Sequence, residues 1–199
     1  MRPLLVVLAL LAVALLIGSR FYPTIETVAV SGNSHYDREE VRELAGVEPG
    51  GALLWVNRWS LAELANDPWI RRARVIRHWP DTVSINVWER TPVITDGTSS
   101  WAADGTLLPG VSEETKAGLV RLEGWGEPRL EEALKLLELL SQFGPRVISY
   151  SPEGFDIELR EKSLYTPGVA VLERHWAAWT NQRGSRVAVY PWGVSERDD

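Results

Sequence analysis

Side chains able to take part in catalysis are scattered along this sequence rather than grouped. The three histidines, His35, His78 and His175, lie far apart and lack the spacing of metal ligands. There is no cysteine to act as a nucleophile, no serine in a G-x-S-x-G elbow and no glycine-rich phosphate loop. We therefore expect a protein without enzyme activity, cofactor or metal site.

Acidic pairs and tryptophans, which mark active sites and glycan sites in other proteins, have structural explanations here. The pairs beginning at Glu39, Glu113 and Glu131 fall at or near expected helix starts, where acids interact favourably with the helix dipole. The ten tryptophans are more typical of core and interface packing than of a platform for sugars.

A cluster of four arginines, Arg71, Arg72, Arg74 and Arg77, is the densest group of like charge. Because the formal net charge of the chain is −6, binding to nucleic acid is disfavoured. On a strand, Arg72 and Arg74 point to the same face. Two interpretations remain open: a solvated sheet face, paired with acids such as Glu26 on a neighbouring strand, or a contact with a partner protein.

The N-terminus carries fourteen apolar residues without a charge, from Leu4 to Ile17. As a helix this run spans about 21 Å, less than the roughly 30 Å hydrocarbon core of a bilayer. Arg20 can reach toward lipid headgroups, and Phe21 and Tyr22 suit an interfacial aromatic belt. The pattern predicts a transmembrane signal-anchor over residues 1–22 and export of the rest. A cleaved signal peptide and a buried core helix are the alternatives.

Three strands and two helices are expected in the next seventy residues. Residues 25–30, 70–78 and 82–89 alternate between apolar and polar positions, as half-buried strands do. Asp37 with Glu40 forms a capping box that begins one helix, and Ser60 with Glu63 forms a second. This order predicts a small α+β unit in which two helices cover one face of a three-stranded sheet.

These elements carry a motif with many fixed spacings. It comprises Val28, Val30, Gly32 and Asn33, then Ala45, Gly46 and Val47, then Pro68, Trp69 and Ile70, and then the run from Ala73 to Val93 that includes Arg77, Trp79, Pro80, Asp81, Glu89, Arg90 and Pro92. The motif resembles a POTRA domain, most of all that of the FtsQ/DivIB family of bacterial cell-division proteins. With this resemblance, residues 23–91 are interpreted as the POTRA domain.

Residues 92–193 are expected to form the second domain of such proteins. A turn at Asp104-Gly105, a long helix opened by Pro128, a one-sided hairpin over residues 147–160, and a further helix from Pro167 are indicated. The fold class is therefore α+β: an N-terminal transmembrane helix, a β-α-α-β-β POTRA domain, and a second mixed domain with an antiparallel sheet and two helices. Residues 194–199 are expected to be a polar tail.

The resemblance implies a function as a non-enzymatic bitopic scaffold of the divisome. Such a protein sits in the cytoplasmic (inner) membrane at the division septum, with most of the chain on the extracytoplasmic side. The implied partners are FtsB- and FtsL-like single-pass coiled-coil proteins, other divisome membrane proteins and the lipid bilayer, and they couple the scaffold to septal peptidoglycan synthesis. Nucleic acid is not among them.

Strand addition at a C-terminal sheet edge is the expected mode of binding. The residues expected to contribute are Val187, Val189, Tyr190, Trp192 and Val194 along the edge, with Arg146 pairing with an acid of the partner. Family members carry a further strand at this point, but here Pro191 interrupts and few residues follow, so that strand is expected to be short or missing. A plain core strand is then the alternative.

Two other functions remain possible interpretations of the same elements. One is a POTRA-type chaperone module for outer-membrane protein assembly or secretion, although no series of amphipathic barrel strands follows. The other is an exported glycan-binding protein that uses its tryptophans.

Overall fold

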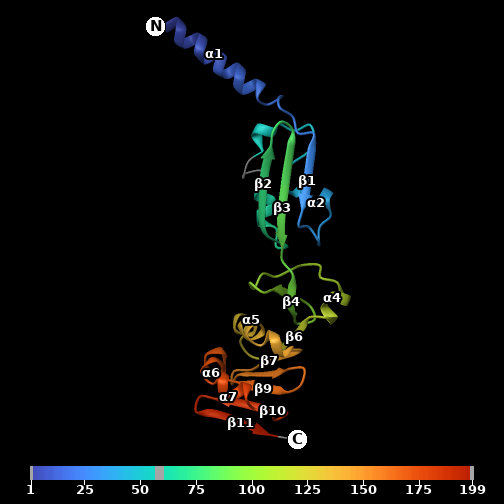
Figure 1. Cartoon of the computed structure of the whole chain (residues 1–199), viewed down its shortest axis with the longest axis vertical. Helices are drawn as coiled ribbons and strands as arrows, with labels where there is room; N and C mark the ends of the chain where they lie inside the picture. The colour runs from blue at the N-terminus through green and yellow to red at the C-terminus, as the bar shows by residue number, and fades with distance from the viewer. Residues whose placement is uncertain (1, 57–60, 198–199) are drawn as a thin grey trace. The chain divides into compact units, whose positions relative to one another are not determined.

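A computed structural model of the protein describes residues 2–56 and 61–197 (Figure 1). The chain divides into two compact units, residues 1–90 and residues 91–199. Each unit contains its own sheet and its own hydrophobic core.

Helix α1 (Arg2–Gly18) displays the apolar N-terminal run to its surroundings. The leucine, valine and isoleucine side chains from Leu4 to Ile17 are 51–66% exposed, so α1 is not a buried core helix. Within the part of the chain that the structure describes, no helix has the combination of length and apolarity that crossing a bilayer requires.

The remainder of unit 1 is a three-stranded sheet with helices. Its elements are β1 (Thr27–Ser31), α2 (Arg38–Leu44), η1 (Leu53–Trp55), α3 (Ala62–Asn66), β2 (Ile70–His78) and β3 (Thr82–Glu89). Strand β3 is central, parallel to β1 and antiparallel to β2. The predicted pairing of Arg72 and Arg74 with Glu26 on a neighbouring strand is wrong, because β3 separates β2 from the β1 side of the sheet.

Sequence periodicity and core positions agree closely in unit 1. Val83, Ile85 and Val87 of β3 are 0–2% exposed and pack with Val41 of α2 and Leu64 of α3. The predicted capping box of α2 is confirmed: Asp37 accepts from the Glu40 N–H, and Glu40 accepts from the Asp37 N–H, both at 2.8 Å. The second predicted capping box involves Ser60, which lies outside the described residues.

Gly32 follows β1 at a point where two backbones meet. Its φ is +82°, and a Cβ placed on it would stand 2.1 Å from the carbonyl oxygen of Val87 in β3. Only glycine fits, because both the left-handed backbone and the close approach exclude a side chain. This explains the glycine of the motif by the packing of β1 against β3.

We predict that Gly32→Ala destabilises unit 1 far more than Gly50→Ala. Gly50 has a similar φ of +86° but nothing within 4 Å of its Cβ position, so it controls for backbone strain, which costs about 1–2 kcal/mol. Gly32→Ala must also displace β3, for a total of about 3 kcal/mol or more. Urea unfolding of the two variants measures the difference, and equal losses would contradict the close-approach explanation.

Tyr36 links the loop before α2 to the end of α3. Its hydroxyl donates to Asp67 Oδ2 at 2.9 Å. Burial, and then the hydrogen bond to and negative charge of Asp67, raise the pKa of Tyr36 from 10.0 to about 12. The folded unit thus holds the Tyr36 proton in a pH range where the unfolded chain releases it.

We predict an alkaline loss of stability that depends on Tyr36. Since the pKa is higher in the folded state, the contribution is complete below pH 10 and disappears as the pH rises from 10 to about 12. Tyr36→Phe should have a flatter stability profile over this range, whereas Tyr22→Phe, which changes a tyrosine that is 75% exposed, should behave as wild type. Denaturant midpoints at several pH values test this, and an unchanged slope in Tyr36→Phe would rule it out.

Unit 2 is built on one eight-stranded sheet with helices. Its elements are β4 (Pro92–Thr95), β5 (Ser100–Ala102), α4 (Glu113–Ala117), β6 (Val120–Gly124), α5 (Leu130–Leu139), η2 (Ser141–Phe143), β7 (Val147–Tyr150), β8 (Phe155–Glu158), β9 (Ser163–Thr166), α6 (Val169–Arg174), α7 (Trp176–Thr180), β10 (Arg186–Tyr190) and β11 (Gly193–Arg197). The strand order is β11-β10-β9-β8-β7-β6-β4-β5.

The sheet is mixed, which corrects the predicted antiparallel sheet. The pairs β4–β6, β6–β7 and β9–β10 are parallel. Each of these pairs is joined through helical segments: α4, α5 with η2, or α6 with α7. A crossover of this kind returns the chain in the same direction. Alternation in the sequence reports which face of a strand is buried and carries no information about direction.

Three strands of unit 2, β4, β9 and β11, are absent from the sequence prediction. Strand β9 is only four residues long and lies among turn-forming residues. Strand β11 replaces the predicted polar tail: Tyr190 pairs with Gly193, so Pro191 and Trp192 form a two-residue connection. Proline is tolerated there because the connection requires no ladder hydrogen bond from its nitrogen. Pro191 therefore turns the chain back instead of ending the sheet.

The inner face of this sheet is covered by its helices. Phe155, Ile157, Val187 and Val189 are at most 1% exposed and belong to the same core cluster as Leu136 of α5. Helix α5 begins at Leu130 rather than at the predicted Pro128. At this start, Arg129 donates to the carbonyls of Ser151 and Pro167 and lies 4.2 Å over the Phe155 ring.

Candidate functional site

Strand β11 is the candidate site because it ends the sheet of unit 2. Among the strands of the described residues, it pairs with β10 alone. Its other side therefore presents backbone N–H and C=O groups that a further strand can pair with. The opposite end of the sheet, β5, has three residues, and Leu107 already bridges Trp101 there, so β11 is the longer open edge.

The predicted edge residues fall into two groups. Val187 and Val189 are fully buried, because they lie on the face of β10 that packs against the helices, and β10 is itself an internal strand. Tyr190 is half-buried, Val194 packs partly against the core, and Trp192 is 82% exposed. The prediction that β10 itself forms the edge is wrong, and the edge backbone comes from β11.

Arg146 lies away from this edge. It is exposed and stands directly before β7, where its N–H donates to the Glu158 carbonyl at 2.8 Å. Its guanidinium group makes no hydrogen bond or ion pair within residues 2–56 and 61–197. Strand β7 is four places from β11 in the sheet, or about 19 Å at the usual strand spacing. A single added strand at β11 does not reach Arg146.

A row of aromatic rings crosses the outer face beside the edge. Tyr165 of β9 lies 5.6 Å from Tyr190, which in turn stacks on Trp192 at 5.1 Å with nearly parallel planes. Sequence reasoning missed Tyr165 because β9 was not predicted. Tyr165 and Tyr190 line a shallow depression of about 800 Å³, together with Glu153 and Asp156. Burial, and then the charge of Glu153, raise the pKa of the Tyr165 hydroxyl, which donates to the Glu153 carbonyl.

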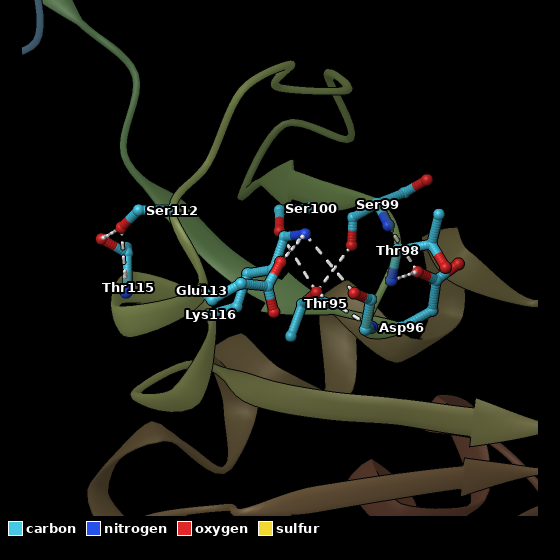
Figure 2. Close-up of polar contacts among 10 residues, drawn as sticks. Thr95, Asp96, Thr98, Ser99, Ser100, Ser112, Glu113, Thr115 and Lys116 are labelled. Atoms are coloured by element: carbon cyan, nitrogen blue, oxygen red, sulfur yellow. Dashed lines mark hydrogen bonds and ion pairs between the residues drawn. The ribbon is translucent and has the colours of Figure 1, made fainter.

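A dense polar cluster around the β4–β5 hairpin is turn chemistry rather than a reactive site (Figure 2). The Thr95 hydroxyl donates to the Ser99 carbonyl at 2.7 Å, and Asp96 Oδ1 accepts from the Thr98 and Ser99 N–H groups. On α4, Lys116 pairs with Glu113 at 2.8 Å. These contacts satisfy backbone groups and a surface ion pair, and none joins a nucleophile to a base.

Two charged residues of the motif are also engaged internally, at the end of β3. The Glu89 carboxylate accepts from the N–H groups of Ser34, His35 and Tyr36 at 2.6–3.3 Å. Arg90 donates to the carbonyls of Pro68 and Ile70. Both side chains therefore hold the loops of unit 1 in place, and their charge is explained without a ligand.

The arginine cluster on β2 has a mixed arrangement. Arg72 and Arg74 share the outer face, as predicted, since they pair with Trp88 and Asn86 of β3. The Arg72 guanidinium lies 5.3 Å over the Trp88 ring, whereas Arg77 donates to the Leu54 carbonyl.

Within the described ranges, no three His, Cys, Asp or Glu side chains are placed to hold a metal ion.

We predict that an aspartate destabilises the protein strongly when placed on β10 and only slightly when placed on β11. Val189→Asp places a charge in the core and should cost about 4 kcal/mol or more, because it has no partner there. Ser195→Asp, on the exposed β11, should cost less than about 1 kcal/mol. Thermal unfolding of each variant measures this, and a stable Val189→Asp protein would contradict the assignment of β10 to the interior.

Comparison with known proteins agrees with the architecture of unit 1. Residues 24–90 match the POTRA domain family of the FtsQ type. The cell division protein FtsQ of Geobacter sp. (strain M21) is 34% identical over 122 residues, which cover 56% of this chain and 44% of that protein. The FtsQ of Mycolicibacterium smegmatis is 38% identical over 104 residues, or 49% of this chain and 31% of that protein. The FtsQ of Geotalea daltonii is 34% identical over 77 residues, 38% of this chain and 28% of the relative. The chain thus matches less than half the length of each of these relatives.

Proposed function

The chain belongs to the FtsQ/DivIB family, and we propose that it acts as a non-enzymatic scaffold of the bacterial division machinery. Its partners in this proposal are FtsB- and FtsL-like single-pass proteins, and through them it is coupled to septal peptidoglycan synthesis. The names of the relatives support a role in cell division. The engagement of the conspicuous polar clusters in turns and loops supports a structural rather than a chemical role.

The observation that carries the proposal is the open edge of β11. An incoming extended segment can hydrogen-bond to this backbone, which supplies affinity independent of sequence, while pockets for alternate side chains supply specificity. Trp192, 82% exposed at the turn into β11, offers a large apolar surface beside the edge. Ring contacts with Tyr190 hold its plane in place, which lowers the entropy lost on binding.

Arg146 has a different part in this proposal. Because three strands, β8, β9 and β10, lie between β7 and β11, a partner that contacts both must extend across the sheet as well as along its edge. A coiled-coil protein with a helix followed by an extended segment meets this requirement. Arg146 then supplies a charge contact to the helical part, and β11 supplies the backbone contact.

Attachment to the cytoplasmic membrane through α1 completes the proposal. The exposed leucine, valine and isoleucine side chains of α1 are better accommodated in lipid than in water, at about 25 cal/mol for each Å² of apolar surface removed from water. The rest of unit 1 and the whole of unit 2 then stand on the extracytoplasmic side, where the division partners have their own exported parts.

We predict that a photoreactive residue at Ser195 crosslinks an FtsB- or FtsL-like protein in membranes of dividing cells. Ser195 lies on β11 and is exposed. The matched control is Asp156, exposed on the internal strand β8, which should give no such product. Purified crosslinks are identified by mass spectrometry.

Each outcome of this experiment discriminates among functions. Crosslinks at Ser195 to outer-membrane protein precursors or to peptidoglycan fragments would replace the scaffold proposal with a chaperone or a glycan-binding function. Equal yields at Ser195 and Asp156 would show contact without use of the β11 edge. Absence of any division protein at either position would remove the proposed partners.

A further inference from the structure

One end of the POTRA domain gathers exposed apolar side chains from three separate segments. Leu54 and Trp55 of η1 are 41% and 40% exposed, and Trp79, between β2 and β3, is 68% exposed. Phe21 and Tyr22, which follow α1, are 72% and 75% exposed. We refer to these five side chains as the apolar rim.

Specific contacts hold the three segments of the apolar rim together. The Trp55 indole N–H donates to the Ser19 hydroxyl at 3.3 Å, and the Arg20 guanidinium lies 4.8 Å over the Trp55 ring. Arg77, at the end of β2, donates to the Leu54 carbonyl at 3.2 Å. The rim is therefore a contiguous feature of unit 1, at the end where β2 passes into β3 (Figure 1).

Charge around the rim is of mixed sign. Arg20, Arg77 and His78 are exposed. Two acids are near: Asp81 is half-buried and accepts the Thr82 hydroxyl, and Glu26, whose N–H donates to the Asp81 carbonyl, is exposed. Two arginines among tryptophan and tyrosine side chains match the interface of a bilayer, where aromatic rings lie at headgroup depth and arginines bind phosphate.

We propose that this end of the POTRA domain is itself a lipid-binding surface for anionic phospholipid headgroups. Trp79 and Leu54 enter the headgroup layer, while Arg77 and Arg20 contact lipid phosphates. This inference rests on the proposed attachment of α1 to the membrane, which brings the rim to the lipid surface. It goes further, because the folded domain docks on the membrane in one orientation instead of swinging on a tether.

The dimensions of the domain make this orientation measurable. Strand β3 runs for eight residues from Thr82 at the rim to Glu89, a length of about 23 Å at strand spacing. The headgroup layer on one side of a bilayer is only about 6 Å thick. If the rim is docked, the Glu89 end of the domain lies well outside the lipid.

The test uses the full-length chain, which has no native cysteine, reconstituted in phosphatidylethanolamine–phosphatidylglycerol vesicles. Single cysteines at three positions carry a fluorophore, and nitroxide lipids quench it according to depth. Leu10→Cys reports on α1, His78→Cys on the rim beside Trp79, and Ser34→Cys on the far end, where the Ser34 N–H contacts Glu89. We expect quenching of Leu10→Cys by acyl-chain nitroxide, quenching of His78→Cys by headgroup nitroxide, and none at Ser34→Cys.

The three positions separate the two proposals. If Leu10→Cys is quenched but neither His78→Cys nor Ser34→Cys is, the rim does not dock and only the anchor stands. If Leu10→Cys is not quenched by lipid, the anchor fails and the lipid-binding rim fails with it. Equal quenching of His78→Cys and Ser34→Cys would show unoriented contact and would also overturn the inference.

Two variants test the side chains in the His78→Cys background. Trp79→Ser should reduce headgroup quenching at least twofold, whereas Trp88→Ser, which removes an exposed tryptophan near the other end of β3, should leave it unchanged. Arg77→Gln should weaken docking about fivefold in vesicles with anionic lipid and little in phosphatidylcholine vesicles. If neither Trp79→Ser nor Arg77→Gln changes the quenching, these side chains do not form the lipid contact.

Discussion

The backbone groups that a sheet leaves unpaired along its edge strands are the constraint on which the proposed function of this protein depends. In both units the inner face of the sheet is closed by helices, and the polar side chains near it are committed to loops and turns. The sheet in unit 2 nonetheless ends at β11, whose outer backbone groups have no strand beside them in the described chain. An open edge of this kind can pair with a strand of another protein, and this capacity underlies the proposed function.

Within the POTRA domain, charge serves folding more than recognition. Asp37, Glu89 and Arg90 each satisfy backbone groups of loops or a helix start. Charge-assisted hydrogen bonds of this kind are stronger than neutral ones and hold loops in one conformation. The two surfaces proposed for binding, the β11 edge with Trp192 in unit 2 and the apolar rim in unit 1, differ in chemistry, one offering a protein backbone and the other aromatic and apolar side chains.

Elements whose signal lies in adjacent residues were predictable. The hairpin of β2 and β3 was expected over the residues it occupies, because alternation and the Trp79-Pro80-Asp81 connection define it locally. The capping box at Asp37 was equally local. Strand β9 was missed because four residues carry too little periodicity, and β11 was missed because Pro191 was interpreted as a stop. The internal position of β10 depends on its pairing with β11, which Pro191 concealed in the sequence.

The sequence by itself determined the POTRA motif, the apolar N-terminal run, the absence of cysteine and the inward face of most strands, since each depends on residue type and short-range spacing. Only the tertiary structure decided which strands pair, in which direction, and which of them ends the sheet. Those properties depend on long-range contacts between segments such as β9 and β10, whose residues carry no mark of their partner. The candidate site is a property of strand order, and for this reason its location passed from β10 to β11.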